Sequence, residues 1–338
     1  MTDYFRPLVQ IGPARPDTAV SLAGGWGWFT HAEVLSRSTP PRVVPAADIP
    51  ASVMARLTAP RPTMAGLTLD RPRIMGILNT TPDSFSDGGQ HNAVPDALRV
   101  AQEMVAAGAD ILDIGGESTR PGADFVHVSE EITRTAPVIA ALRGAGLHTP
   151  ISIDTRKAAV AEAAVNAGGN LVNDVSGFTF DPALGPLCQK LALPVCVMHA
   201  QGDPATMHLD PQYDNVLLDV FDALERQISI LEASGIPRGA ILADPGIGFG
   251  KTQDHNLALL ARLSLFHALG TPILLGVSRK RFIGTIGNAP QAQDRAPGSI
   301  AVALAGLGQG VQMIRVHDVD DTRQAVALWH AAYFGSIL

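Results

Sequence analysis

Eight short apolar runs in this sequence are each followed at once by polar or charged residues that could do chemistry. These groups are Asn79, Glu117 to Arg120, Asp154, Asn173 with Asp174, His199, Asp244, Ser278 to Lys280, and His317 with Asp318. An Asp or Asn after a strand is often only a helix cap or a turn former, and that alternative stays open for each such residue alone. It does not explain why Lys and Arg recur in the same places. We therefore interpret the set as one site.

The cationic and hydrogen-bond-donating members suit an anion with several oxygens. They are Asn79, Arg120, Lys280, Arg315 and His317. Arg presents a planar fork of donors to phosphate oxygens, and an acidic protein can still hold a local cationic pocket. These residues predict a phosphate or pyrophosphate group on the ligand.

The acidic and amide members suit another part of the ligand. Asp154, Asn173 and Asp244 can exchange hydrogen bonds with the amide and amino edges of a planar heterocycle. A buried carboxylate such as Asp244 matches a guanidine-like edge, because a buried charge without a partner is costly. Together the two groups predict a nitrogen heterocycle that carries a phosphate or pyrophosphate.

The apolar runs are short and apolar throughout, as are parallel strands buried on both faces. They span 74–78, 111–115, 151–153, 171–173, 195–198, 241–243, 273–276 and 312–316. Helix-like segments lie at 95–107, 130–143, 157–167, 214–234, 255–269, 299–307 and 321–332. Eight strand–helix units over roughly 265 residues predict an α/β fold, a (β/α)₈ TIM barrel, whose strand ends meet at one face. A doubly wound open sheet is the alternative, but the Gly-rich turn after its first strand is missing.

Residues 1–70 differ from the predicted barrel at 71–338, because prolines interrupt them repeatedly and long helical periodicity is absent. Val20 to Leu35 could form a hairpin in which Trp26 and Trp28 alternate. We interpret this segment as an N-terminal extension of unknown role, packed on the barrel or on a partner subunit.

The composition is that of a soluble globular protein, with 46% hydrophobic and 17% charged residues among 338. A net charge of −7 argues against a nucleic-acid or membrane-surface partner. The start lacks a signal-peptide pattern, and no apolar run reaches the roughly 18 residues of a membrane span. Cys188 and Cys196 lack metal-ligand spacing, so we expect buried thiols in a reducing cytoplasm.

Three weaker patterns fail on inspection. The stretch 246–252 is similar to a phosphate-binding P-loop, but Pro245 stands where its first Gly should be. The stretch 276–280 approaches a nucleophile elbow but lacks the last Gly. His199 and His208 lack a third ligand at zinc-like spacing, so no zinc site is expected.

The polar motifs closely resemble those of one family, the dihydropteroate synthases of folate biosynthesis. The similar stretches are IMGILNTTPDSFSDGG (74–89), DILDIGGESTRPGA (110–123), ISIDTRK (151–157), LVNDVSG (171–177), VCVMHAQGDPATM (195–207), ILADPGIGFGKTQDHN (241–256), LLGVSRKRFIG (274–284) and MIRVHD (313–318). They follow the family order and cover the chain from about residue 73 to its end. Eight linked motifs are far more specific than a shared fold.

The resemblance implies a transferase that condenses 6-hydroxymethyl-7,8-dihydropterin pyrophosphate with para-aminobenzoate, giving 7,8-dihydropteroate and pyrophosphate. It also implies a Mg²⁺ cofactor, a homodimer and a sulfonamide target. The implied pterin contacts are Asp154, Asn173, Met198, Asp244, Phe249, Lys280 and Arg315. The implied pyrophosphate contacts are Asn79, Arg120, Arg315 and His317, with Asn79 also on Mg²⁺. The implied para-aminobenzoate contacts are Phe85, Thr119, Pro121 and Lys280. Lys280, Arg315, His317 and Asp154 are the expected catalytic residues.

One position departs from the family pattern. Arg281 follows Lys280 where some members carry a small Ser near the aminobenzoate, which puts one contact of the second pocket in question. Two other functions compete: a pterin-binding methyltransferase that uses methyltetrahydrofolate, and a non-catalytic barrel subunit. The cationic clusters favour the synthase, because a methyltransferase has no pyrophosphate to hold.

Overall fold

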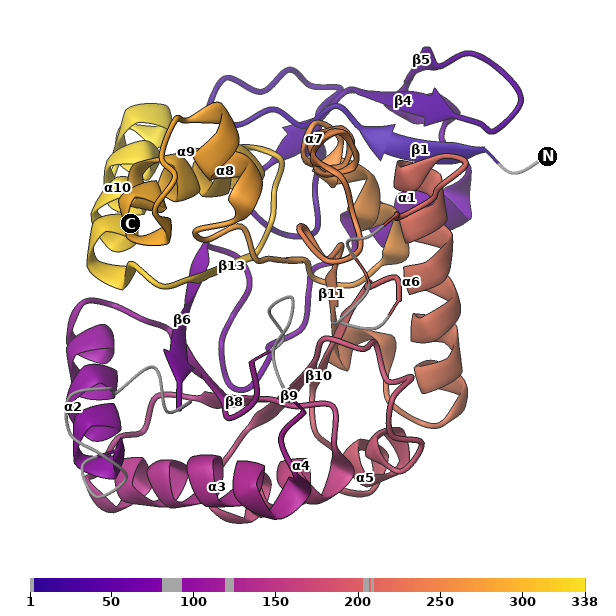
Figure 1. The fold of residues 1–338 in the computed structure, drawn as a ribbon. Helices are drawn as coiled ribbons and strands as arrows, with labels where there is room; N and C mark the ends of the chain where they lie inside the picture. The colour runs from indigo at the N-terminus through magenta and orange to yellow at the C-terminus, as the bar shows by residue number, and fades with distance from the viewer. Residues whose placement is uncertain (1–2, 81–92, 119–124, 203–206, 208–209, 338) are drawn as a thin grey trace.

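A ring of eight parallel strands forms the centre of the computed structural model, which describes residues 3–80, 93–118, 125–202, 207 and 210–337 (Figure 1). The strands are β6 (Arg73–Asn79), β7 (Ile111–Gly115), β8 (Ile151–Asp154), β9 (Leu171–Asp174), β10 (Val195–Met198), β11 (Ile241–Asp244), β12 (Leu274–Leu275) and β13 (Met313–Val316). Their hydrogen-bonded order is β11-β10-β9-β8-β7-β6-β13-β12. A parallel bridge between Ala243 and Ile273 joins the two end strands. The predicted barrel is confirmed, and the open-sheet alternative is wrong.

Helices surround this ring on its outside (Figure 1). They are α2 (Ala93–Ala106), α3 (Val128–Gly144), α4 (Ala158–Asn166), α5 (Leu184–Lys190), α6 (Val216–Ala233), α7 (Gln253–Leu260), α8 (Arg281–Ile286), α9 (Ala296–Gly308) and α10 (Val319–Phe334). None of the helices in the described part of the chain is long and apolar enough to cross a membrane.

The helix prediction was wrong at three places. Helix α5 was not predicted, because it has only seven residues and contains Gly185 and Pro186. Helix α8 was not predicted either, since six residues are too few to display a helical period. The segment predicted as one helix at 255–269 is divided into α7 and a 3-10 helix, η4 (Leu263–Leu269). All seven residues of η4 are buried, so no polar face marks the break.

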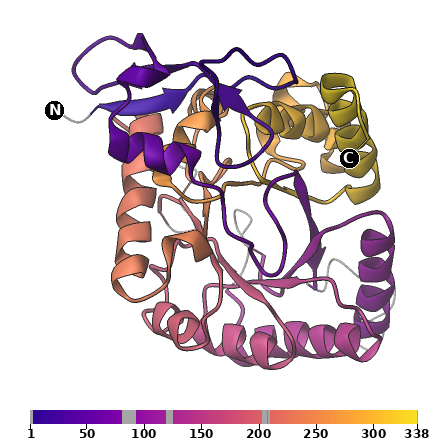
Figure 2. The same cartoon turned by 180° about the vertical axis from the view of Figure 1, so that it is seen from behind.

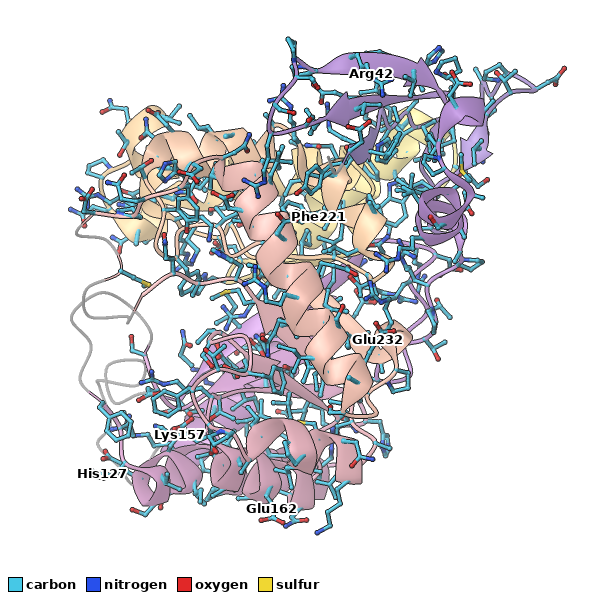
Figure 3. All side chains as sticks on the ribbon, turned by 90° about the vertical axis from the view of Figure 1, so that its right-hand side faces the viewer. Arg42, His127, Lys157, Glu162, Phe221 and Glu232 are labelled. Atoms are coloured by element: carbon cyan, nitrogen blue, oxygen red, sulfur yellow. The ribbon has the colours of Figure 1, made fainter. Side chains whose placement is uncertain are left out.

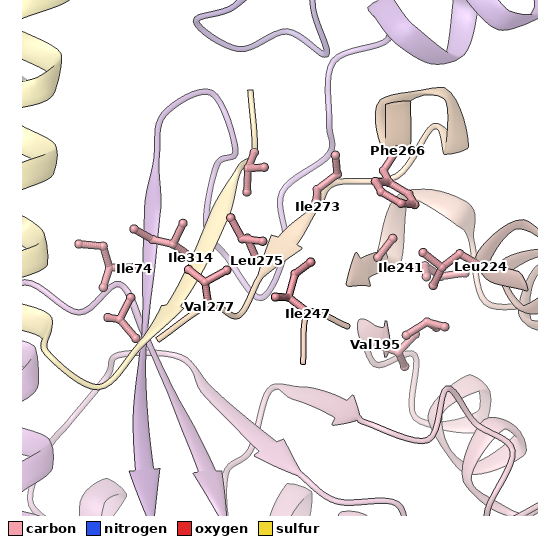
Figure 4. Close-up of a cluster of buried hydrophobic side chains, with 14 of the residues drawn as sticks. Ile74, Val195, Leu224, Ile241, Ile247, Phe266, Ile273, Leu275, Val277 and Ile314 are labelled. Atoms are coloured by element: carbon pink, nitrogen blue, oxygen red, sulfur yellow. The ribbon is translucent and has the colours of Figure 1, made fainter. Parts of the chain in front are cut away.

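The outward-facing side chains of the strands pack against the helices. Ile74 of β6, Ile314 of β13 and Leu275 of β12 are fully buried and belong to one large apolar cluster (Figure 4). A second cluster fills the inside of the barrel at the amino ends of the strands, with Met75, Ile111, Leu171, Cys196, Leu242, Leu274 and Met313. Met64 and Leu69, which precede β6, join that inner cluster. The segment that leads into β6 crosses this end of the barrel, as the view from behind shows (Figure 2).

The N-terminal extension forms two small sheets and a helix. Strands β1 (Tyr4–Pro7), β4 (His31–Leu35) and β5 (Arg42–Pro45) make an antiparallel sheet in the order β1-β4-β5, and α1 (Ala51–Thr58) follows. Strands β2 (Val20–Ser21) and β3 (Trp28–Phe29) pair as a hairpin. The hairpin predicted within Val20 to Leu35 is therefore present, but β4 at the end of that range belongs to the other sheet.

The extension packs on the barrel helices through side chains of both partners. The Tyr4 hydroxyl donates to Asp222 of α6 at 2.9 Å, and its ring meets Phe221 edge-on at 5.5 Å. Phe221 lies on the long helix α6 (Figure 3). Arg6 donates to the Ser264 hydroxyl of η4 at 3.1 Å. These bonds attach the first sheet to the outer layer of the barrel.

Trp26 provides the deepest of these attachments. Its indole N–H donates to the Leu307 carbonyl of α9 at 2.9 Å, and its ring lies edge-on to Trp329 of α10 at 6.4 Å. Both rings are buried, with 8% and 9% of their surface exposed. Trp26 thus belongs to the same apolar cluster as the barrel residues.

We predict that Trp26→Ala lowers the free energy of unfolding by about 3–5 kcal/mol, because it leaves a cavity and removes the hydrogen bond to the Leu307 carbonyl. Urea unfolding followed by circular dichroism measures this change without relying on tryptophan fluorescence. Val43→Ala, on the exposed face of β5, serves as the control and should change the value by less than about 0.5 kcal/mol. A loss below about 1 kcal/mol for Trp26→Ala would mean that the extension unfolds separately from the barrel.

Candidate active site

Inward-facing side chains change from apolar to polar along the barrel strands. Because side chains alternate between the two faces of a strand, every second residue points into the barrel. On five strands, the next inward-facing residue after the inner apolar cluster lies two positions further along the chain. These residues are Asp113, Asn173, Met198, Asp244 and Arg315, which follow Ile111, Leu171, Cys196, Leu242 and Met313. The register places Asp154 opposite Asn173 and Met198 opposite Asp244. The residues predicted for pterin binding therefore meet inside the carboxyl end of the barrel.

Arg315 occupies the middle of this polar layer. Its Nε donates to Asp113 Oδ2 at 2.5 Å, and its Nη2 donates to Asp154 Oδ2 at 2.8 Å. The Asn173 amide donates to the same Asp113 oxygen at 3.2 Å. Four side chains from strands β7, β8, β9 and β13 are thus joined in one network.

One guanidinium cannot neutralise two carboxylates, so this network keeps an excess of negative charge. Burial raises the pKa of Asp154 to about 7, with Arg315 opposing the shift and Asp113 adding to it. Burial by itself lowers the pKa of Arg315, but Asp113 and Asp154 outweigh it, so Arg315 stays charged. The site therefore holds a fixed cation beside a carboxylate that titrates near neutral pH.

Asp244 lies at the end of β11, against a glycine-rich loop. Its Oδ1 accepts a hydrogen bond from the Gly246 N–H at 2.7 Å. Gly246 has a φ of +67°, and a Cβ there would lie 1.8 Å from the His199 carbonyl oxygen, so only glycine fits. Burial raises the pKa of Asp244, while the Gly246 N–H and the charges of Lys280, Lys251 and Arg315 lower it.

Lys280 and Phe249 form one side of the same space. The Lys280 ammonium lies 3.9 Å from the centre of the Phe249 ring, which is a cation–π contact. A Cβ on Gly248 would lie 3.0 Å from Lys280 Cδ, so the loop runs close beneath this side chain. The predicted pterin contacts Lys280, Phe249 and Asp244 are therefore neighbours in the structure.

The turn that carries Lys280 is held in an unusual backbone conformation. Arg279 has a φ of +57°, which costs a non-glycine residue on the order of 1–3 kcal/mol. Its N–H donates to the Ser299 hydroxyl at 2.8 Å, and its carbonyl accepts from Arg295 at 3.0 Å. Its guanidinium pairs with Asp318, with Nε at 3.1 Å from Oδ2. These bonds stabilise the strained turn and set the direction of the next residue.

His317 follows β13 and is joined to the turn after β12. The Ser278 hydroxyl lies 2.9 Å from His317 Nδ1 and accepts from the His317 N–H at 3.1 Å. His317 is half-buried and lies two residues after Arg315. The loops that carry Lys280 and His317 are thus linked to each other.

Asn79 ends β6, the strand that pairs with β13. It is half-buried, and its Oδ1 would lie 3.8 Å from a Cβ placed on Gly115, so the amide oxygen faces the end of β7. No group of three or more His, Cys, Asp or Glu side chains gathers as metal ligands within the described ranges. A single amide oxygen fits Mg²⁺, which takes few protein ligands when a substrate phosphate supplies others.

Four predicted site residues lie outside the described residues. They are Phe85, Thr119, Pro121 and Arg120. The predicted para-aminobenzoate pocket is therefore represented here by Lys280 alone.

Two of the acidic residues after strands have structural partners. Asp174 accepts hydrogen bonds from the N–H groups of Ser176 and Phe178 at 2.7 Å each, as a turn former does. Asp318 is paired with Arg279 and makes no side-chain cap for α10. The turn-forming alternative therefore holds for Asp174, whereas Asp318 acts through the turn that carries Lys280.

Two residues of the site were not predicted from the sequence. Asp113 is a charged residue within the apolar run ILDIG, and its inward position was a signal that could have been used. Lys251 follows the glycine loop and is buried, with 5% of its surface exposed. Nothing in the sequence distinguishes Lys251 from a surface lysine.

The geometry supports binding of a flat, polar ring with an anionic substituent. Carboxylate and amide groups at the ends of strands β7, β8, β9 and β11 offer hydrogen bonds to ring edges, while Lys280 and Phe249 offer a face. Arg315 supplies a cation that is already oriented before any ligand binds.

Comparisons with known proteins also indicate a protein that binds a pterin. The family described as pterin binding enzyme matches residues 75–317. The dihydropteroate synthase of Escherichia coli is 44% identical over 255 residues, which cover 75% of this chain and 89% of that protein. A Xanthomonas albilineans dihydropteroate synthase solved with 4-aminobenzoic acid has a TM-score of 0.75 and 44% identity, covering 79% of this chain and 96% of that one. The chain belongs to the dihydropteroate synthase family.

Membership of the dihydropteroate synthase family confirms the predicted transferase of folate biosynthesis. A Yersinia pestis dihydropteroate synthase, solved with a sulfonamide drug complex, has a TM-score of 0.74 and 46% identity, covering 79% of this chain and 96% of that one. The match to the family begins at Met75, so the N-terminal extension lies outside it.

We predict that Asp154 contributes a fall in the stability of the protein as the pH rises from about 4 to about 7. Its pKa is about 7 in the folded protein and near 4 in an unfolded chain, so the folded state binds more protons in this window. One such group contributes at most about 1.4 kcal/mol per pH unit. Asp154→Asn should flatten the dependence, measured by urea unfolding at several pH values.

The control for this measurement is Glu103→Gln, an exposed carboxylate on α2. It should keep the pH dependence of the unmodified protein. An equal slope in Asp154→Asn and in the unmodified protein would show that Asp154 does not titrate in this range.

Proposed function

We propose that this protein condenses 6-hydroxymethyl-7,8-dihydropterin pyrophosphate with para-aminobenzoate to give 7,8-dihydropteroate and pyrophosphate. The observation that carries the proposal is the cation Arg315, held between Asp113 and Asp154 beside Asn173. Related synthases have been solved with 4-aminobenzoic acid and with 7,8-dihydropteroate, which supports the same substrates here. The sulfonamide complex of the Yersinia pestis enzyme likewise supports sulfonamide binding at the second pocket.

The pterin ring would occupy the space between the strand ends. Asp154, Asn173 and Asp244 would bind the amide and amino edges, because the buried Asn173 and Asp244 and the half-buried Asp154 need polar partners. Asp113 Oδ1 is buried without a hydrogen-bond partner among the described residues, which supports the presence of a further donor on the ligand. Met198, on the inward face next to Asp244, would contact the ring from below.

The reaction breaks the bond between the pterin methylene carbon and the pyrophosphate oxygen. The electron pair leaves with pyrophosphate, the amine nitrogen of para-aminobenzoate forms the new C–N bond, and its proton passes to solvent. Bond breaking runs ahead of attack, since the delocalised pterin can carry positive charge beside Asp154 and Asp244. No protein nucleophile is required.

Arg315 and His317 would bind the departing pyrophosphate, together with Asn79 and with Arg120, which lies outside the described residues. Negative charge grows on the leaving group in the transition state, so a cation fixed in advance stabilises it more than it stabilises the substrate. Arg315 meets this requirement, because two carboxylates hold its guanidinium.

Mg²⁺ is the proposed cofactor, with Asn79 as its protein ligand. When bound, it would neutralise charge on the pyrophosphate oxygens. Asn79 orients its amide oxygen toward the barrel mouth from the end of β6, a position from which it can share an ion with the phosphate.

The second substrate would bind beside Lys280. Thr119, Pro121 and Phe85 are the other proposed contacts, and Arg281 is the first residue of α8 directly after Lys280. Arg281 is exposed, so it borders this pocket without filling the interior.

We also propose a homodimer located in the cytoplasm. Large apolar side chains on α8 and α10 are exposed, with Ile286, Leu328 and Tyr333 at 58, 66 and 50%. A second copy that covered them would remove apolar surface from water. Cys188 and Cys196 are free and buried thiols, which suits a reducing compartment.

The proposed activity predicts release of pyrophosphate from the dihydropterin pyrophosphate when para-aminobenzoate and Mg²⁺ are present. Lys280→Ala and Arg315→Ala should each lower kcat/KM by about 10²–10³-fold, because each removes a charge at the reacting end of the substrate. Arg315→Lys keeps the positive charge but loses the planar set of guanidinium donors. Its kcat/KM should also fall, with less risk to the fold.

Lys190→Ala and Arg99→Ala, both on exposed helix surfaces, are the controls and should keep full activity. Circular dichroism checks that each variant is folded, so that a collapse would identify a structural role. Methyl transfer from methyltetrahydrofolate without any pyrophosphate release would overturn the proposed activity.

The metal proposal predicts that Mn²⁺, used in place of Mg²⁺, binds more weakly to Asn79→Ala when pyrophosphate is present. The loss should be at least about tenfold, as for other changes around a metal ion. Electron paramagnetic resonance counts the free Mn²⁺ directly and does not depend on turnover. Asn166→Ala, exposed at the end of α4, is the control, and equal binding by both variants would remove Asn79 from the metal site.

A further inference from the structure

Lys251 is a buried lysine between the ends of β10 and β11, and the proposed chemistry does not use it. Its ammonium lies 2.9 Å from the Gly246 carbonyl oxygen, 3.0 Å from that of Phe249 and 3.2 Å from that of His199. It also lies 3.0 Å from the His199 ring nitrogen Nδ1. The three carbonyls come from two separate segments, so one ammonium joins the end of β10 to the glycine loop after β11.

The protonation states of Lys251 and His199 determine which of them donates the hydrogen bond that joins them. Burial and the charge of Lys251 lower the pKa of His199 to about 3, so the imidazole is neutral and its Nδ1 can accept. A protonated lysine has three hydrogens and no acceptor, which matches an environment made only of acceptors. These acceptors therefore favour the ammonium form of Lys251, which predominates below its pKa of about 7.

Among the described residues, no hydrogen bond or ion pair joins the Lys251 ammonium to a carboxylate, and the negative charge that acts on it is that of Asp244. Burial lowers the pKa of Lys251 to about 7, Asp244 raises it, and Lys280 lowers it further. Asp244 in turn is held by the N–H of Gly246, whose carbonyl oxygen accepts from Lys251. A cation that served only to fasten a loop would not need to lie beside the carboxylate of the binding site.

We propose that Lys251 is a positioning residue for the pterin: it fixes the Phe249 backbone and the end of β10, and its charge keeps Asp244 ionised. This inference rests on the proposed function. Asp244 and the Phe249 ring form two sides of the ligand space, and Lys251 lies behind both of them. The other cations that face Asp244 are Lys280 and Arg315, and the Cys196 thiol lies below it in the barrel.

The direction of the pH effect follows from this geometry. A pterin edge with two N–H donors binds the ionised form of Asp244, so affinity falls as the pH drops through the pKa of that carboxyl. Without the Lys251 charge, Asp244 holds its proton to a higher pH. The pH below which pterin binding is lost should then rise, by roughly one pH unit for the loss of a neighbouring opposite charge.

The test is equilibrium binding of 6-hydroxymethylpterin, followed by the ligand's fluorescence between pH 5 and 9. Lys251→Gln keeps hydrogen-bond donors but removes the charge, whereas Lys251→Arg keeps the charge. We expect Lys251→Gln to bind 6-hydroxymethylpterin about tenfold more weakly at neutral pH, the scale of a lost charged hydrogen bond. The acid limb of its pH profile, where binding is lost on acidification, should also lie at higher pH. Lys251→Arg should keep the acid limb of the unmodified protein, and Lys190→Gln, on the surface of α5, should match it fully.

The outcomes separate the inference from the function on which it rests. If the unmodified protein binds no pterin at any pH, the proposed function is wrong. If it binds, and Lys251→Gln weakens affinity with an unchanged acid limb, Lys251 only fastens the loop and the inference is overturned. Should Lys251→Gln fail to fold, a raised acid limb in the charged Lys251→Arg variant would overturn the inference as well.

Discussion

The guanidinium of Arg315, shared by the carboxylates of Asp113 and Asp154, is the interaction on which the site depends. A cation inside a barrel is stable only when paired, and a pair of buried carboxylates is stable only beside a cation. The three groups therefore hold one another in place before a ligand arrives. Since two negative charges face one positive charge, the network can still accept donors from a heterocycle.

This network is possible because the barrel interior is divided into two layers. At the amino ends of the strands, Met75, Leu242 and Met313 make an apolar layer, and Met64 packs against it. At the carboxyl ends, the same strands present polar groups, as is usual for the catalytic face of this fold. The extension attaches to the outer helices through Tyr4 and Trp26, so it adds stability away from the polar layer.

The sequence predicted the barrel and its polar strand ends for a simple physical reason. Buried parallel strands must be apolar throughout, so a residue such as Asp154 or Asp244 marks the point where a strand leaves the core. Asp113 was missed because it lies within a strand, where only its inward direction reveals its role. Helix α5 and the break before η4 were missed because short or fully buried helices have no amphipathic pattern. The partners of Lys251 are backbone carbonyls, which no side-chain pattern records.

Strained and closely packed backbone segments set the shape of the ring-binding half of the site. Gly246 brings its loop against the His199 carbonyl, where no Cβ would fit, and Arg279 holds a left-handed turn directly before Lys280. Such conformations persist only where several bonds fix them, and here each is fixed by neighbours that also contact the site. The free-energy cost of fixing these conformations arises during folding, so binding and bond breaking need no rearrangement of the charged groups. A leaving group that gains negative charge then meets a cation that is already in position.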